Sequence, residues 1–373
     1  MKPFQHSMAI GSNARELVNT CLARLGDIDN NANLGFIYLS DALSSELDHI
    51  LHLLQQATGI DHWYGSVGVA ICSTRREIYD QPSMVIMLAE FPPDTFRTIP
   101  ALSTNTDDFL QSQETWLSAH PAHFAVVHGD PSNPMIPKLI EDLSSGLGAG
   151  FFTGGLTSSQ TQNLQIAEKV TDGGLSGVLF SPEIEIMVSH TQGCSPIGPV
   201  RTITDCAANI IMEIDGITAL EAIRQDVGEV LSRDLSKLGG FIFAGLPIQN
   251  SDTGDYMVRN LLGVDSQQER IAIGDRVENG DAIMFCRRDG NTAREDMLKM
   301  LEGLKKRCKG RTPRGGLYVS CLGRGKFQFG ENSEEVSMIS DVLGDFPLAG
   351  FFASGEIFHN RIYGYTGVLT LFM

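Results

Sequence analysis

A histidine and a cysteine share one short loop rich in glycine and proline, and they are the first candidates for chemistry. His190 ends a predicted strand, and Cys194 follows four residues later, just before Pro196 and Pro199. Glycine and proline at this density disfavour regular structure, so we expect a shaped loop. Loops at strand ends carry functional side chains disproportionately often. His190 therefore could bind a ligand or a metal, and hydrogen bonding of its ring to the loop backbone is the competing interpretation.

Arg324, between two glycines in the segment 321–325, is a second candidate. In this position its guanidinium could bind an anionic ligand or a carboxylate. Glu356, which follows the second of two Phe-Phe pairs, is a potential ion-pair partner for it. A structural salt bridge between domains is the competing interpretation of this pair. No acid–base pair stands at a spacing typical of an active site, so we do not expect an enzyme.

Two weaker signals complete the candidates. His128 ends a predicted strand before Gly129-Asp130, and it is the second choice after His190 for binding a metal. The glycine-rich segment 146–150 follows a predicted helix and opens a strand. A phosphate-binding loop has the opposite order, so helix capping by glycine explains this segment better.

A duplicated unit must position these side chains. Each copy reads as strand, helix, Phe-Phe strand and closing strand; one spans 124–181 with Phe151-Phe152, and the other spans 317–372 with Phe351-Phe352. The segment 34–89 has the same order without the Phe pair, so we interpret it as a degenerate copy. Side chains alternate along a strand, so at most one ring of each pair can line a site, and ordinary core packing is expected for the others.

The predicted fold class is α/β, with α+β as the alternative: mixed β-sheets covered by helices and built from these units. We expect a tail and an N-terminal helix over residues 1–30, followed by two domains at 31–205 and 206–373. The segments 270–273 and 282–287 are predicted to form a hairpin around Asn279-Gly280.

Composition excludes several classes of protein. The 373 residues include 28 Lys and Arg against 45 Asp and Glu, a net charge of −17. Nucleic acids and anionic membrane surfaces are therefore poor partners, because both require basic surfaces. The sequence has neither a run of about 20 apolar residues nor a signal-peptide pattern, so we expect a cytoplasmic protein that does not bind membranes. The seven cysteines form no Cys-x-x-Cys motif and indicate no zinc site.

Five motifs in order resemble the FIST family, and the resemblance covers about 34–372. The motifs are Gly150-Phe-Phe-Thr-Gly-Gly155, Gly193-Cys-Ser-Pro-Ile-Gly198, Glu213-Ile-Asp-Gly216, Cys321-Leu-Gly-Arg-Gly325 and Gly350-Phe-Phe-Ala-Ser-Gly-Glu356. The resemblance implies a FIST N domain at 31–205, a FIST C domain at 206–373, and a role as a bacterial sensor in signal transduction. It also implies a signalling partner such as a sensor histidine kinase, because the chain has no kinase segment of its own. A homodimer is compatible with it.

The segment 190–196, His-Thr-Gln-Gly-Cys-Ser-Pro, is most similar to the stand-alone bacterial FIST proteins that bind haem and sense nitric oxide. That resemblance implies haem b held by His190, because a neutral imidazole is a common ligand of haem iron. Nitric oxide at ferrous iron weakens the bond to the opposite ligand, so release of His190 would free the Cys194 loop and signal to the partner. The further residues expected at the cofactor are Cys194, Phe152, Phe352, Arg324 and Glu356.

Two alternatives remain open at this stage. One is a sensor of a small polar metabolite, such as an amino acid, that uses Arg324 and Glu356 and no haem. The other is an uncharacterised enzyme. A Soret absorption band in protein purified from cells supplied with haem would distinguish the haem sensor from both.

Overall fold

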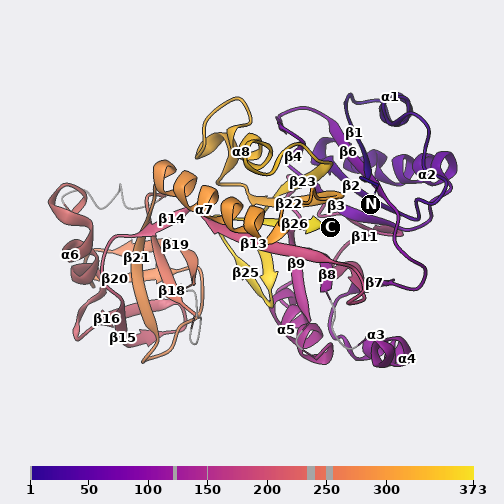
Figure 1. Ribbon diagram of the computed structural model, residues 1–373. Helices are drawn as coiled ribbons and strands as arrows, with labels where there is room; N and C mark the ends of the chain where they lie inside the picture. Colours follow the sequence, from indigo (N-terminus) through magenta and orange to yellow (C-terminus); the bar gives the residue numbers. More distant parts are fainter. Residues whose placement is uncertain (1, 121–123, 149, 233–239, 249–254) are drawn as a thin grey trace. The chain divides into compact units, whose positions relative to one another are not determined.

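The chain forms two compact units. A computed structural model describes residues 2–120, 124–148, 150–232, 240–248 and 255–373 (Figure 1). The larger unit contains Met1–Thr191 and Asp296–Met373, and the smaller unit contains Gln192–Glu295. The smaller unit is thus inserted into the sequence of the larger one. This division in space differs from the linear division at residue 206 that the sequence suggested.

Three repeats of one element order build the larger unit, so the copy at 34–89 is not degenerate in topology. The first repeat contains β1 (Gln5–Ile10), α1 (Ala14–Leu25), β2 (Leu34–Ser40), α2 (Leu47–Thr58), β3 (Trp63–Gly68), β4 (Ala70–Ser73), β5 (Arg76–Tyr79) and β6 (Ser83–Ala89). The second contains β7 (Phe96–Leu102), α3 (Asp107–Ser112), α4 (Glu114–Ala119), β8 (Phe124–Gly129), α5 (Ile136–Gly146), β9 (Phe151–Leu156), β10 (Gln165–Ala167), β11 (Lys169–Thr171) and β12 (Leu175–Phe180). The third contains β13 (Ile186–Gln192), α7 (Gly290–Cys308), β22 (Gly315–Cys321), α8 (Glu334–Leu343), β23 (Leu348–Ala353), β24 (Glu356–His359), β25 (Arg361–Tyr363) and β26 (Thr366–Phe372).

Each repeat forms most of one mixed sheet. The orders are β1-β6-β2-β3-β10-β11, β7-β12-β8-β9-β24-β25 and β13-β26-β22-β23-β4-β5. In all three, the strand after the first helix is parallel to the strand that follows it and antiparallel to the closing strand. These mixed sheets, covered by helices, confirm the predicted α/β fold class.

The last two strands of each sheet come from a different repeat. The hairpin β4-β5 follows β3 in the chain, yet β4 pairs with β23 of the third repeat. The hairpin β10-β11 follows β9, and β10 pairs with β3 of the first repeat. The hairpin β24-β25 follows β23, and β24 pairs with β9 of the second repeat. This hairpin exchange forms a closed cycle, so no repeat completes its sheet alone.

One glycine in each repeat allows the two parallel strands to approach closely. A Cβ atom added to any of the three would lie 1.6–1.8 Å from the carbonyl oxygen of the residue opposite, which no side chain tolerates. The pairs are Gly65 with Ile37, Gly154 with Val127, and Gly350 with Tyr318. These glycines fix the equivalent register in the three repeats.

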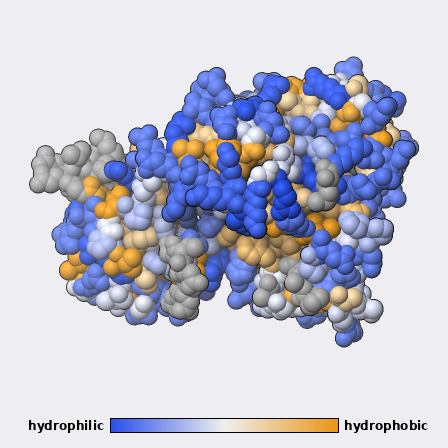
Figure 2. All heavy atoms as spheres, viewed as in Figure 1, coloured by the Kyte–Doolittle hydropathy of each residue, from blue (hydrophilic) through white to orange (hydrophobic). Residues whose placement is uncertain are grey.

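The inner faces of the three sheets share one apolar core, which we call the common core. It includes Tyr38 from the first sheet, Val126 from the second, and Val319 and Phe351 from the third. Helices α1 and α2 pack on the outer face of the first sheet, and α3, α4 and α5 pack on that of the second. The face of the molecule in Figure 2 is predominantly hydrophilic, with apolar side chains in separate patches.

In its described residues, the smaller unit is a closed antiparallel barrel that carries helix α6. It contains β14 (Cys194–Pro196), β15 (Arg201–Ala207), β16 (Ile210–Ile214), β17 (Ile217–Thr218), α6 (Ala219–Ser232), β18 (Ile242–Pro247), β19 (Tyr256–Asp265), β20 (Arg270–Ile273) and β21 (Ala282–Arg288). Because β18 pairs with both β19 and β21, the ring β21-β15-β16-β20-β19-β18 closes. The predicted hairpin of 270–273 with 282–287 is wrong, since β20 pairs with β16 and β19, and β21 pairs with β14, β15 and β18.

Candidate functional site

A cavity of about 350 Å³ lies where strands of the first and third repeats end. Ser40 is the last residue of β2, Leu322 directly follows β22, and Phe352 lies near the end of β23. In open α/β sheets, ligands bind outside the carboxyl ends of the strands. We call this cavity the strand-end pocket. Its polar and aromatic lining includes Asp41, Tyr79, Asp80, Lys326, Phe327 and Phe352.

Charges of both signs stand beside aromatic rings in the strand-end pocket. The Lys326 ammonium lies 2.9 Å from an Asp80 carboxylate oxygen and 4.5 Å from the centre of the Tyr79 ring. Asp41 accepts a hydrogen bond from the Gln160 backbone N–H (2.8 Å). The Phe352 ring is 1 % exposed, and its centre is 5.1 Å from that of Tyr79. The pocket can therefore contact an apolar body and both an anionic and a cationic group.

A buried polar network holds the pocket's loop in place. Tyr79 donates its hydroxyl proton to Glu77 (2.7 Å), and the Lys326 backbone N–H donates to the Tyr79 oxygen (3.2 Å). Burial, followed by the nearby Glu335 carboxylate, raises the pKa of Glu77 to about 7. Glu335 also accepts the backbone N–H of Gly325 (2.6 Å). The backbone that carries Lys326 is thus bound on both sides.

Arg324 pairs with Glu335 and not with Glu356. Its Nε donates to Glu335 Oε1 over 2.7 Å, and both side chains are 0 % exposed. The same carboxylate oxygen accepts hydrogen bonds from the Tyr318 and Ser320 hydroxyl groups. Arg324 is therefore a structural residue of the loop that presents Lys326 to the pocket.

Glu356 binds the backbone of the closing strand. Its Oε2 accepts the backbone N–H (3.0 Å) and the hydroxyl (2.7 Å) of Thr366, while its buried Oε1 has no hydrogen-bond partner among the described residues. Burial raises the pKa of Glu356 to about 8. Arg324 Nη1 donates to the carbonyl of Tyr365 (3.4 Å). Arg324 and Glu356, which the sequence suggested as an ion pair, thus bind two adjacent residues, Tyr365 and Thr366.

His190 lies beside an apolar cleft. Its ring is partly exposed on β13, with its centre 4.2 Å from the centre of the Phe358 ring. Residues of a strand that are two apart share a face, so His190 has the orientation of Val188 and Ile186. Those two line a cleft of about 330 Å³ together with Phe124, Phe151 and Arg307. We call it the β13 cleft.

The β13 cleft has counterparts in the other repeats. It lies at the start of β8 and β9, beside the edge strand of the next sheet. At the start of β2 and β3, beside β7, a cavity of about 510 Å³ is lined by His62, Phe96 and Glu168 among others. At the start of β22, beside β1, Phe4 is 5 % exposed, and a Cβ on Gly315 would lie 2.3 Å from its ring. The Phe4 ring thus fills the place in the third sheet that corresponds to the cavities in the other two.

Two family models match the chain in sequence order. The FIST N domain matches residues 33–217, and the FIST C domain matches residues 219–359. The chain belongs to the FIST family. FIST domains are sensor domains of signal transduction. The boundary between the two FIST domains falls inside the barrel, between β17 and α6, so both contribute strands to it.

Similar proteins occur in mycobacteria. An uncharacterized protein of Mycobacterium tuberculosis strain H37Rv is 31% identical over 323 residues, which is 83% of each chain. An uncharacterized protein of Mycobacterium bovis is 29% identical over 321 residues, 83% of this chain and 82% of the relative. No helix in the described part of this FIST chain is long and apolar enough to cross a membrane.

The other predicted site residues of the FIST chain lie in three different environments. Phe152 is buried on the outer face of the second sheet among residues of α5. Cys194, at the start of β14, is buried in the barrel unit, and its carbonyl accepts the Tyr256 hydroxyl (2.7 Å). His128 is enclosed in the common core, where burial lowers its pKa to about 3. This environment suits a neutral core imidazole.

Of the predicted residues, Phe352 alone is among those that line the strand-end pocket. The sequence reasoning missed Asp41, Tyr79 and Lys326. One signal was available, because Asp41 directly follows a predicted strand and Lys326 lies two residues from Arg324. Glu335 was also missed, although an acidic residue beside the apolar face of a predicted helix indicates a buried partner.

Proposed function

We propose that this FIST protein senses a small polar metabolite, such as an amino acid, in the strand-end pocket. The observation that carries the proposal is one pocket with an ammonium, two carboxylates and three aromatic rings at the ends of strands from two repeats. Lys326 would bind the ligand's carboxylate, and Asp41 and Asp80 its ammonium group. Lys326 and Asp41 thus take the roles that the sequence reasoning gave to Arg324 and Glu356.

Signalling follows from the position of the pocket between repeats. Asp41 belongs to the first repeat and Lys326 to the third, so a bound ligand would bridge them. A ligand that binds one arrangement of the repeats better shifts the population toward that arrangement. A partner such as a sensor histidine kinase would respond to this shift.

Binding to variants tests the proposal. Calorimetry with each of the common amino acids should identify at least one that binds the full chain. Lys326→Ala should weaken that binding at least about tenfold, because a charge-assisted hydrogen bond contributes about 1.5–3 kcal/mol. Lys305→Ala, at an exposed position of α7, should leave it unchanged. Equal binding by the wild-type protein and Lys326→Ala would refute this assignment.

Haem-based sensing of nitric oxide at the β13 cleft is a second candidate. The position of His190 on the same strand face as the apolar residues Ile186 and Val188 favours it. The side chains fit the group chemically: His190 would bind the iron, Phe151 would contact the porphyrin, and Arg307 would pair with a propionate. Haem b would supply the iron at which nitric oxide binds.

Titration of the haem-free protein with haemin tests the second candidate separately. A Soret band at one haem per chain is expected, and His190→Ala should shift it or abolish it. His52→Ala, at an exposed position of α2, is the matched control. An identical spectrum and affinity for His190→Ala would exclude His190 as the iron ligand. Neither result depends on Lys326, so the two candidates are distinguishable.

A further inference from the structure

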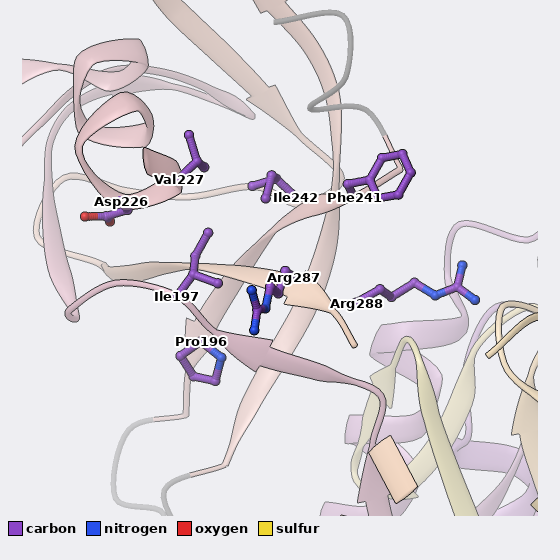
Figure 3. A pocket seen from close by; sticks show the side chains of 8 residues that line it. All are labelled: Pro196, Ile197, Asp226, Val227, Phe241, Ile242, Arg287 and Arg288. Carbon is purple, nitrogen blue, oxygen red and sulfur yellow. The ribbon is translucent and has the colours of Figure 1, made fainter. Parts of the chain in front are cut away.

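A separate cavity of about 400 Å³ opens at one end of the barrel unit (Figure 3). Its walls come from β14 and the segment after it, α6, the start of β18 and the end of β21. Mouths of β-barrels are common places for small-molecule sites, and this volume lies in the usual range. The lining combines apolar side chains with arginine, a combination that the strand-end pocket does not share.

Arg287 is a charged group that faces this cavity. It follows Ile283 and Phe285 at intervals of two on β21, and both of those side chains pack inside the barrel. Arg287 therefore continues the inward row at the barrel mouth, opposite Ile242 of β18. In Figure 3 its guanidinium lies beside Pro196, and the neighbouring Arg288, which also belongs to the lining, extends in a different direction. The Arg287 side chain is 59 % exposed, and its contact with Asp289 is as long as 3.5 Å.

Asp226, the one carboxylate among the described lining residues, is already engaged. Asp226 is bound by two nitrogens of Arg201, at 2.7 and 3.1 Å, and its side chain is 4 % exposed. A Cβ on Gly198 would lie 2.3 Å from that carboxylate, so the glycine allows Asp226 to turn toward Arg201. The charge offered to a ligand is therefore positive, in a chain whose net charge is −17.

Apolar groups surround the arginine. Ile197, Val227 and Ile242 line the cavity, and Phe241 stands at the rim with 64 % of its surface exposed. An aromatic ring at the rim of a cavity offers a large apolar surface to a bound molecule. The ring and the guanidinium together suit a molecule with one apolar end and one anionic end.

We propose that the barrel mouth binds a small anionic molecule with an aromatic or other apolar body. Its carboxylate or phosphate group pairs with Arg287, since a guanidinium binds either anion through two parallel hydrogen bonds. Its body lies against Ile197 and Ile242, with the Phe241 ring over it. This site lies in the smaller compact unit and uses none of the residues of the strand-end pocket or the β13 cleft.

Calorimetry on the full chain with phenylacetate and with phenyl phosphate tests the proposal and distinguishes the two anions. At least one of them should bind with a dissociation constant below about 1 mM, whereas benzyl alcohol, which lacks the charge, should bind at least tenfold more weakly. Arg287→Gln should weaken the anion's binding at least about tenfold. Phe241→Ala removes an exposed ring and should weaken it severalfold.

The controls separate this site from the others and from general electrostatics. Arg270→Gln makes the same charge change in the same unit, at a residue that pairs with Asp265 away from the cavity, and should leave binding unchanged. Lys326→Ala should also leave it unchanged. Equal loss in Arg270→Gln and Arg287→Gln would overturn the proposal, as would the absence of binding of both anions to the wild-type chain.

Discussion

The Tyr38 hydroxyl lies 3.2 Å from Nε2 of His128, and this hydrogen bond joins the first and second repeats inside the common core. Tyr38 directly follows Ile37, whose carbonyl lies against Gly65, and His128 directly follows Val127, whose carbonyl lies against Gly154. Tyr38 and His128 therefore occupy equivalent positions in their repeats. The third equivalent residue is Val319. Phe351 completes the group, because its ring stacks on Tyr38 at 5.2 Å and lies 5.8 Å from His128. A polar contact thus lies where the three repeats meet.

His128 should make the protein sensitive to acid. Its folded-state pKa of about 3 lies below the ordinary value of 6.5, so the unfolded chain binds the extra proton and stability falls as the pH drops from about 6.5 toward 3. From pH 7 to pH 5 the loss attributable to this group is about 2 kcal/mol. His128→Gln, which keeps a partner for Tyr38, should lose less over this interval. Urea unfolding followed by tryptophan fluorescence measures it, because Trp63 and Trp116 both lie in the larger unit.

Glu356 should have the opposite pH dependence. Its folded-state pKa of about 8 lies above the ordinary value of 4.5, so the folded chain holds the extra proton and stability falls as the pH rises from 4.5 through 8. Glu356→Gln should therefore reduce the loss of stability between pH 6 and pH 9 by roughly 3 kcal/mol. Glu331→Gln, at an exposed position, is the control. The same pH profile for the wild type and Glu356→Gln would mean that Glu356 is ionised in the folded protein.

Removing one partner of the buried Arg324–Glu335 pair should be costly. Glu335→Ala leaves a fully buried guanidinium without its counter-charge, so we expect the free energy of unfolding to fall by about 3–5 kcal/mol. The double variant Arg324→Met/Glu335→Leu should lose clearly less than the sum of the single variants Arg324→Met and Glu335→Leu. A double-variant cycle in urea checks this, and strict additivity would contradict the coupling.

The three glycines at which the parallel strands approach closely, Gly65, Gly154 and Gly350, should not tolerate alanine. Gly65→Ala places a Cβ 1.6 Å from the Ile37 carbonyl oxygen, which forces the parallel strands apart. A loss of about 3 kcal/mol or more is expected from this backbone clash. Gly303→Ala in α7 meets no atom within 4 Å and should stabilise the helix by about 1 kcal/mol. Similar melting temperatures for Gly65→Ala and wild type would refute the register argument.

The sequence predicted the repeats well because their signals are local. A strand followed by an amphipathic helix and a second strand is readable within about 40 residues, and all three copies carry it. The hairpin exchange could not be predicted from the sequence. Ser73 pairs with Ala349, and nothing near either residue in the sequence specifies that partner. The barrel was not predicted for the same reason. Asn279-Gly280 favours a local hairpin, whereas β20 and β21 pair instead with strands more distant in sequence.

The site was predicted less well than the fold. Alternation correctly separated the two rings of each Phe-Phe pair, and Phe352 lies in the strand-end pocket whereas Phe351 lies in the common core. The partner of Arg324 was misassigned because Glu335 and Glu356 are both acidic and both close in sequence to the third repeat's strands. The distance that decides between them, 2.7 Å to Glu335, depends on how α8 packs on β22.

The hairpin exchange has a consequence for biosynthesis. The hairpin β4-β5 leaves the ribosome early, but its partner β23 starts only at Leu348. Until β23 is synthesised, one edge of β4 has no strand to pair with. An unpaired strand edge is the kind of surface that aggregates or recruits chaperones. Closing the cycle also joins segments far apart in sequence, which makes folding slow. The larger unit should therefore acquire its native structure only once β23 has been synthesised, and in one cooperative step.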